Sequence, residues 1–182
     1  MEEKNDLLIT TLQNNDTISE QLISIADQIV QSYSAVLDNL MQRIYQAVVT
    51  TQDVSDQTLE NYFLELSSTL YFVGEQVEHL GISTDVAEAQ FKEKFNTAYL
   101  NYAAERDDKG KSLRTVNENT ALATEQSKYE SAVNDLQTRA FDLLKYKITA
   151  AQTMVGTLSK MLSKKISDAS LTMTSSKGTA EW

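Results

Sequence analysis

Apolar residues recur along this chain at intervals of three and four, which is the spacing of residues on one face of an α-helix. The first long run follows the turn-favouring pair Asn14-Asn15, and the capping-box sequence Thr17-Ile-Ser-Glu20 stands at its start. Its apolar positions are Ile18, Leu22, Ile25, Ile29, Tyr33, Val36, Leu40, Ile44 and Ala47. The pattern predicts a short first helix, a turn at the asparagines, and a long helix over residues 17–51.

A strict heptad follows the polar segment TTQDVSDQT. Its apolar positions alternate by four and three, and they are Leu59, Phe63, Leu66, Leu70, Val73, Val77 and Leu80. This spacing is typical of helices that pack along one continuous seam. Gly81 comes directly after the seam, where a helix-ending glycine would stand. We therefore expect the helix to end there, with His79 in its last turn, and Ser83-Thr84-Asp85 to cap the next helix.

The second half of the chain predicts two further helices joined by a charged turn. The first of them has apolar positions at Val86, Phe91, Phe95, Ala98, Tyr99 and Tyr102. The turn falls at Asp107–Gly110, within AAERDDKGKSLRT, and Ser112 or Thr115 restarts the helix. The last helix is expected over residues 113–166. Gly156 within it is the residue type that allows close packing against a neighbouring backbone.

These elements predict an all-α protein built from long helical hairpins or a coiled-coil-like bundle. The chain has no proline and only five glycines, so few positions force a helix to break. A core of this size cannot bury a helix as long as residues 113–166 by itself, so we expect that helix to pair with the preceding helix, with the N-terminal helices or with another subunit. We expect an acidic N-terminal region at residues 1–82, a helical hairpin at 83–168, and a mobile polar tail at 169–182. Trp182 in that tail is either an anchor for a partner or an end without a role.

Charge is divided unevenly between the two halves. Residues 1–91 contain two basic and fifteen acidic residues, whereas residues 92–182 contain fourteen basic and eleven acidic residues. Such asymmetry is consistent with different partners for each half, and also with two solvated helix faces.

Several classes of chemistry are not indicated by the residues present. The chain has no cysteine and one histidine, and it has no GxGxxG or GxxxxGK[ST] loop. No nucleophile-base pair or metal-ligand cluster is evident, so we expect a non-enzyme without a cofactor or metal. No apolar run is long enough to span a bilayer, and the acidic N-terminus does not resemble a signal peptide. The expected location is the cytoplasm, or a virion in the structural alternative described below.

Basic residues around the predicted turn are the candidate binding site. They are Lys92, Lys94, Arg106, Lys109, Lys111 and Arg114. Lysine and arginine neutralise nucleic-acid phosphates, and nearby aromatic residues can stack on unpaired bases. Tyr99 and Tyr102 lie close by, although both also fit the apolar face of their helix. The sequence predicts single-stranded DNA binding that becomes appreciable when oligomerisation gathers several turns.

The segment EAQFKEKFNTAYLNYAAERDDKGKS, from Glu88 to Ser112, resembles the central helix and turn of the phage UvsY-type recombination mediators. The following segment, from Lys128 to Ile166, resembles their long C-terminal helix. This resemblance implies a homo-oligomeric ring that binds single-stranded DNA. It also implies contact with a recombinase. The mediator helps this recombinase to take the place of the single-strand-binding protein on the DNA.

Two other functions fit the same sequence. One is a structural coiled-coil component of a virion or another large assembly, in which the long helices are the functional element. The other is an acidic inhibitor that uses the N-terminal half to occupy a basic surface of a host protein.

Overall fold

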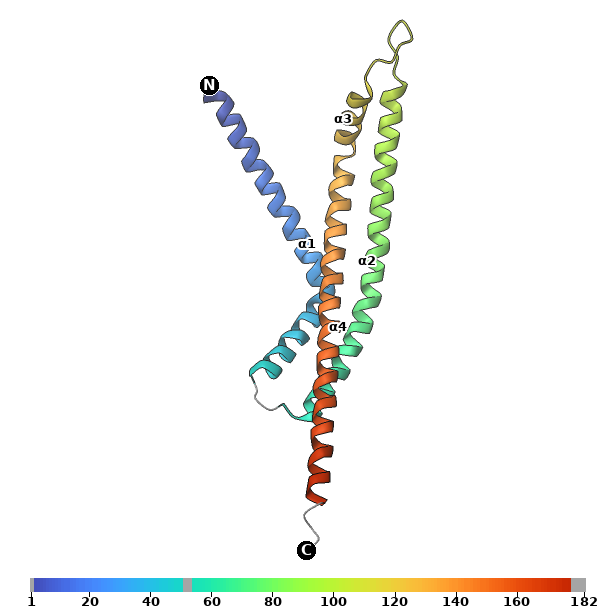
Figure 1. Ribbon diagram of the computed structural model, residues 1–182. Coiled ribbons are helices and arrows are strands. Elements are labelled where there is room, and N and C mark those ends of the chain that lie inside the picture. The colour runs from blue at the N-terminus through green and yellow to red at the C-terminus, as the bar shows by residue number, and fades with distance from the viewer. Residues whose placement is uncertain (1, 51–53, 178–182) are drawn as a thin grey trace. The chain divides into compact units, whose positions relative to one another are not determined.

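The computed structural model describes residues 2–50 and 54–177, and within them it places the side chains of residues 20, 23–50 and 54–170. The elements in chain order are α1 (Glu2–Thr50), α2 (Asp56–Ala104), α3 (Val116–Gln126) and α4 (Lys128–Lys177), as Figure 1 shows. No strand occurs in the described ranges, where the only sheet-like feature is an isolated bridge between Arg106 and Ser112. The predicted all-α class is confirmed.

Two predicted helix boundaries are wrong. Asn14-Asn15 lies inside α1, and the segment from Gly81 to Asp85 lies inside α2. The polar residues that were expected to cap a helix are accommodated within it, since Thr84 Oγ1 donates to the carbonyl oxygen of Leu80 at 3.0 Å. A turn-favouring residue costs a helix interior only about 0.5–1 kcal/mol. The continuous apolar faces on both sides outweigh that cost.

Gly81 has a packing role in place of the predicted capping role. A Cβ atom at this position would lie 3.0 Å from Cζ of Phe141, so the ring of α4 rests against the backbone of α2. His79 is therefore an exposed residue in mid-helix and does not face a helix end. Within the described chain Gly156 has no close neighbour, because nothing lies within 4 Å of a Cβ placed there.

The last predicted helix is two helices. Thr115 caps α3, and Ser127 separates α3 from α4. Ser127 is fully buried, its hydroxyl donates to the carbonyl oxygen of Ala123 at 2.8 Å, and its backbone departs from helical geometry with a φ of −101° and a ψ of 10°. The predicted helix end at residue 166 is also wrong, because α4 continues to Lys177. Residues 178–182, including Trp182, lie outside the described residues.

The chain divides into two compact units, each made of segments that are distant in sequence. Unit 1 comprises Met1–Gln31 and Glu78–Leu143, and unit 2 comprises Ser32–Val77 and Leu144–Trp182. In unit 1, Ser83 of α2 donates to Gln137 of α4 at 3.5 Å, so these antiparallel segments form a hairpin.

Most of the predicted heptad of α2 is buried, with Leu59 and Leu66 fully inaccessible and Val73 and Val77 nearly so, while Phe63 and Leu70 are half-buried. In unit 2 the face predicted for α1 is buried at Leu40 and Ile44, and it is wrong at Val36. Val36 is 69% exposed, whereas its neighbour Leu37 is 1% exposed. The buried positions of α1 from there onward are Leu37, Leu40 and Ile44, which keep the spacing of three and four.

Charged contacts join the three helices of unit 2. Lys147 of α4 donates to Asp38 Oδ2 at 2.5 Å and to the buried Ser34 hydroxyl at 3.0 Å, both on α1. Lys165 of α4 donates to the carbonyl oxygen of Val54 at 2.6 Å, and it pairs with Asp56 at the start of α2. These contacts tie α4 to α1 and to the start of α2.

Candidate nucleic-acid interface at the hairpin tip

The loop from residue 105 to residue 115 forms the tip of the hairpin in unit 1, between the end of α2 and the start of α3 (Figure 1). Thr115 and Glu118 form a complete capping box at the start of α3. The Thr115 hydroxyl accepts from the N–H of Glu118 at 3.3 Å, and Glu118 Oε2 accepts from the N–H of Thr115 at 2.7 Å. These bonds from Thr115 lower the pKa of Glu118, because they favour the ionised carboxylate. Of the two predicted restart residues, Thr115 is the one used.

Asp107 organises the turn itself. Its Oδ1 accepts from the backbone N–H of Lys109 at 2.9 Å and of Lys111 at 2.8 Å. Its own N–H donates to the carbonyl oxygen of Lys111 at 2.9 Å, which closes the loop. Gly110 has a φ of +75°, in the left-handed region that glycine adopts without strain. The predicted turn at Asp107–Gly110 is confirmed, and an aspartate followed three residues later by glycine was the available signal for Asp107's role.

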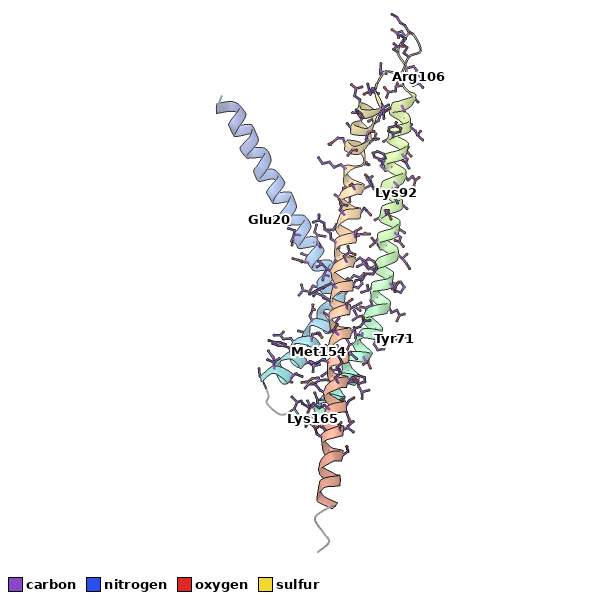
Figure 2. The ribbon with its side chains drawn as sticks, viewed as in Figure 1. Glu20, Tyr71, Lys92, Arg106, Met154 and Lys165 are labelled. Carbon is purple, nitrogen blue, oxygen red and sulfur yellow. The ribbon has the colours of Figure 1, made fainter. Side chains whose placement is uncertain are left out.

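Arg106 caps the end of α2. Its Nη1 donates to the carbonyl oxygens of Ala103 at 2.6 Å and of Glu105 at 3.0 Å. Carbonyls at a helix C-terminus lack partners within the helix and carry partial negative charge, so a cation is favoured there. Figure 2 shows Arg106 at this end of the hairpin. The guanidinium is exposed but is already held by two acceptors.

Arg114 braces the base of the loop. It forms an ion pair with Glu105 at 2.5 Å, and its guanidinium carbon lies 5.3 Å from the ring centre of Tyr102. Tyr99 stacks on Phe95, with ring centres 6.5 Å apart. Both tyrosines are partly buried in the hairpin, so they serve its packing as their place in the apolar pattern indicated, rather than standing free for bases.

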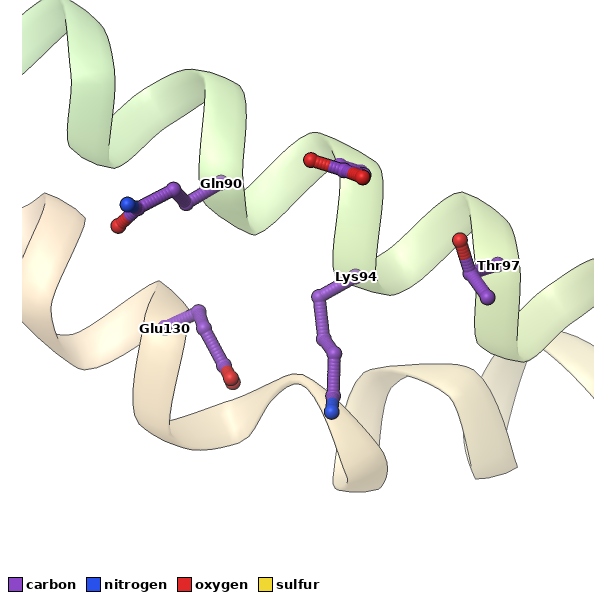
Figure 3. Close-up of a pocket in the computed structure, with 5 residues that line it drawn as sticks. Gln90, Lys94, Thr97 and Glu130 are labelled. Carbon is purple, nitrogen blue, oxygen red and sulfur yellow. The ribbon is translucent and has the colours of Figure 1, made fainter.

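Lys92 and Lys94 lie on α2 well before the tip. About ten residues separate Lys94 from the end of the helix, or about 15 Å along its axis. Lys92 pairs with Glu88 at 2.5 Å, one turn away. Lys94 lines a shallow groove with Glu130, and in Figure 3 its side chain extends across towards the opposite arm of the hairpin. The structure therefore does not bring these two lysines together with the four basic residues of the loop.

Lys109 and Lys111 are the exposed cations of the tip, and within the described ranges their ammonium groups form no ion pair. Two of the three acidic side chains nearby are engaged elsewhere, Glu105 by Arg114 and Asp107 by backbone N–H groups. Asp108 is the remaining acid in the loop. The exposed ammonium groups of Lys109 and Lys111 therefore share the loop with two exposed carboxylates, Asp107 and Asp108.

Other kinds of site are not present in the described part of the chain. No three histidine, cysteine, aspartate or glutamate side chains gather there in a way that could hold a metal ion. No helix within it combines the length and the apolar character needed to cross a membrane.

Comparisons with known proteins give no relative from which a site could be transferred. The chain matches no protein-family model, no curated protein and no solved structure. Functional reasoning therefore depends on the geometry of the tip and of the helix faces.

Proposed function

We propose that this chain is a non-enzymatic protein that binds single-stranded DNA through the tip of its hairpin and acts as a homo-oligomeric recombination mediator. The observation that carries the proposal is a pair of exposed lysines, Lys109 and Lys111, which form no ion pair among the described residues and lie on a turn held by Asp107. A fixed turn presents its charges without the entropic cost of ordering a loop on binding.

The mode of binding would be electrostatic. Each ammonium group near a phosphate releases a condensed counterion, so affinity falls with salt concentration and does not depend on sequence. One tip offers few such contacts and is therefore a weak binder. Several tips in one oligomer act on the same strand and raise the overall affinity by effective concentration. The resemblance to the UvsY-type mediators supports loading of a recombinase as the purpose of that binding.

The double substitution Lys109→Glu/Lys111→Glu tests the proposed site, with fluorescence anisotropy of a labelled oligonucleotide as the readout. We expect binding to weaken, and the slope of log affinity against log salt to shrink by about 1.4 for each engaged tip, because single-stranded DNA contributes about 0.7 per phosphate contact. Lys128→Glu is the matched control, since its side chain is 75% exposed and lies on α4, away from the loop. If the control and the double variant weaken DNA binding equally, the tip is not the binding site.

A second candidate is a structural component of a large assembly. The specific observation in its favour is the number of large apolar side chains that remain exposed, Tyr71, Tyr129 and Tyr146 among them at 73%, 77% and 72%. Exposed aromatic residues on rigid helices are typical of surfaces that are covered in an assembly. Mass spectrometry of purified particles checks this candidate. Stoichiometric presence of the chain in particles would favour it over the mediator.

A further inference from the structure

In unit 2, α2 has an apolar face opposite its buried seam. Leu64, Tyr71 and Phe72 are 62%, 73% and 62% exposed, and the two rings meet edge to face with centres 5.4 Å apart. Figure 2 labels Tyr71 on this helix. Glu60 and Glu75 stand on the same face, one before and one after the apolar residues, and no basic residue accompanies them. We call these five residues the acidic face.

In unit 2, α4 also has an exposed face opposite its buried residues, with the complementary character. Three basic residues lie on it, Lys145, Lys160 and Lys164, together with Tyr146. Between them the side chains are small, namely Thr149, Thr153, Gly156 and Thr157. We call this set the basic face.

The side chains between the lysines of the basic face are short, and the threonine hydroxyls among them already donate hydrogen bonds within α4. The hydroxyls of Thr149, Thr153 and Thr157 donate to carbonyls one turn earlier on the same helix, at 2.9, 2.9 and 3.0 Å. Gly156 opens onto empty space. A bulky apolar side chain from another helix can therefore approach the backbone of α4 here without leaving a polar group unpaired.

We propose that the acidic face of one copy binds the basic face of a second copy. Three properties of the faces agree with this pairing: large apolar groups meet small ones, negative charges meet positive ones, and both faces are exposed in the single chain. Two acidic faces placed together would repel each other, as would two basic faces, so unlike faces are selected.

The positions of the charges specify the orientation. Glu60 and Glu75 are fifteen residues apart, as are Lys145 and Lys160, which is about 22 Å along each helix. In an antiparallel arrangement Glu60 lies level with Lys160, and Glu75 with Lys145. The same register sets Leu64 against Gly156, so the apolar and charged pairs match together.

The consequence of unlike faces is an assembly that is not a closed pair of copies. Each chain carries one face of each kind, so a second copy leaves two faces unused and the contact repeats head to tail. Such heterologous contacts give a ring where the rotation closes and a filament where it does not. The inference does not rest on DNA binding by the tip, although it would supply the gathering of tips that such binding needs.

Cysteine cross-linking tests the contact directly, because the chain has no cysteine of its own. Full-length Leu64→Cys and Gly156→Cys proteins are mixed under mild oxidation, and each is also oxidised alone. We expect a cross-linked dimer in the mixture only. A mixture of Leu64→Cys with Thr149→Cys is the register control, since Thr149 lies about 10 Å further along the helix, and we expect at least tenfold less product there.

The other outcomes would overturn the proposal. A dimer from Leu64→Cys alone would mean that like faces pair, and a cross-link as strong in the register control would mean non-specific collision. No cross-link in any mixture would mean that the faces do not meet.

A charge exchange gives independent evidence from the oligomer mass in sedimentation. Lys160→Glu should weaken assembly at least about tenfold, because it sets two carboxylates at the same level, while circular dichroism stays that of the wild type. Adding Glu60→Lys in the same chain should restore the mass. Failure of the double variant to recover, with helicity intact, would contradict the assigned register.

Discussion

At the scale of single residues, the charges of the tip are distinguished by what each side chain contacts. Arg106 and Arg114 have the same charge as Lys109 and Lys111, but the arginines hold the end of α2 and the base of the loop. A sequence gives the number of such charges and their spacing. It does not reveal which of these charged side chains already contact other groups of the loop. Those contacts depend on the geometry of the loop, in which Asp107 accepts hydrogen bonds from two backbone N–H groups.

Asp107→Ala should loosen the tip, since it removes the acceptor of two backbone N–H groups. A lost acceptor of this kind costs about 1–3 kcal/mol locally where the groups are shielded from water, and less where water replaces it, as at this exposed loop. Amide hydrogen exchange at Lys109 and Lys111 measures the effect, and we expect it to quicken. Asp108→Ala is the neighbouring control that should leave both rates unchanged. Slow exchange in Asp107→Ala would mean that the turn is held by other contacts.

The capping box makes a prediction about pH. The folded pKa of Glu118 is lowered from its ordinary value of 4.5 by its bonds to Thr115. The stabilisation of α3 by the ionised carboxylate is therefore complete above the ordinary pKa, and it is lost as the pH falls through the folded value. NMR titration of the Glu118 carboxyl should give a midpoint below 4.5, and Thr115→Ala should raise it. An unchanged midpoint in that variant would show that the cap does not form.

At the scale of elements, the sequence predicted the helical faces better than the helix ends. Most of the heptad of α2 is buried as its spacing predicts, because burial follows directly from apolar periodicity. The helix ends predicted at Asn14-Asn15 and at Gly81 were wrong, because both positions lie inside helices. The preference of cap and turn residues for non-helical backbone is weaker than the tendency of a continuous apolar face to stay helical. The interruption at Ser127 had no signal of its own, since serine is common inside helices and its bond to Ala123 appears only in the folded chain.

Two glycines of α2 make a matched pair for testing what Gly81 does. Gly74→Ala should raise the free energy of unfolding by about 0.5–1 kcal/mol, because alanine favours the helix and nothing lies within 4 Å of the new Cβ. Gly81→Ala should be worse than Gly74→Ala by at least about 1 kcal/mol, because its Cβ meets the Phe141 ring at 3.0 Å. Urea denaturation of both variants measures the difference. Equal gains would show that Phe141 moves aside freely.

The contacts of Lys147 make a second prediction at this scale. Lys147→Met should lower the free energy of unfolding by about 1–2 kcal/mol, because it removes the ion pair with Asp38 and the hydrogen bond to the buried Ser34 hydroxyl. Lys128→Met removes only an exposed ion pair with Glu125 and should change the free energy by less than about 0.5 kcal/mol. The same denaturation experiment compares the two. Equal decreases in the free energy of unfolding would mean that the Lys147 contacts do not stabilise unit 2.

At the scale of the whole molecule, the chain carries two kinds of exposed surface. The tip offers a small preorganised set of positive charges, and the faces of α2 and α4 in unit 2 offer a way to repeat it. The sequence predicted the tip, because the charged turn is visible in it, whereas assembly through the long helices stays a prediction. It did not predict the two complementary faces, because the exposed aromatic residues and the threonines become surfaces only once the buried side of each helix is known.

DNA binding by the tip is tested most directly with wild-type protein and labelled single-stranded DNA, by anisotropy across a salt series that begins at about 50 mM. We expect saturable binding whose log affinity falls linearly with log salt and is the same for oligonucleotides of different sequence. Absence of binding at the lowest salt would contradict the proposed function, as would an affinity that does not change across the series.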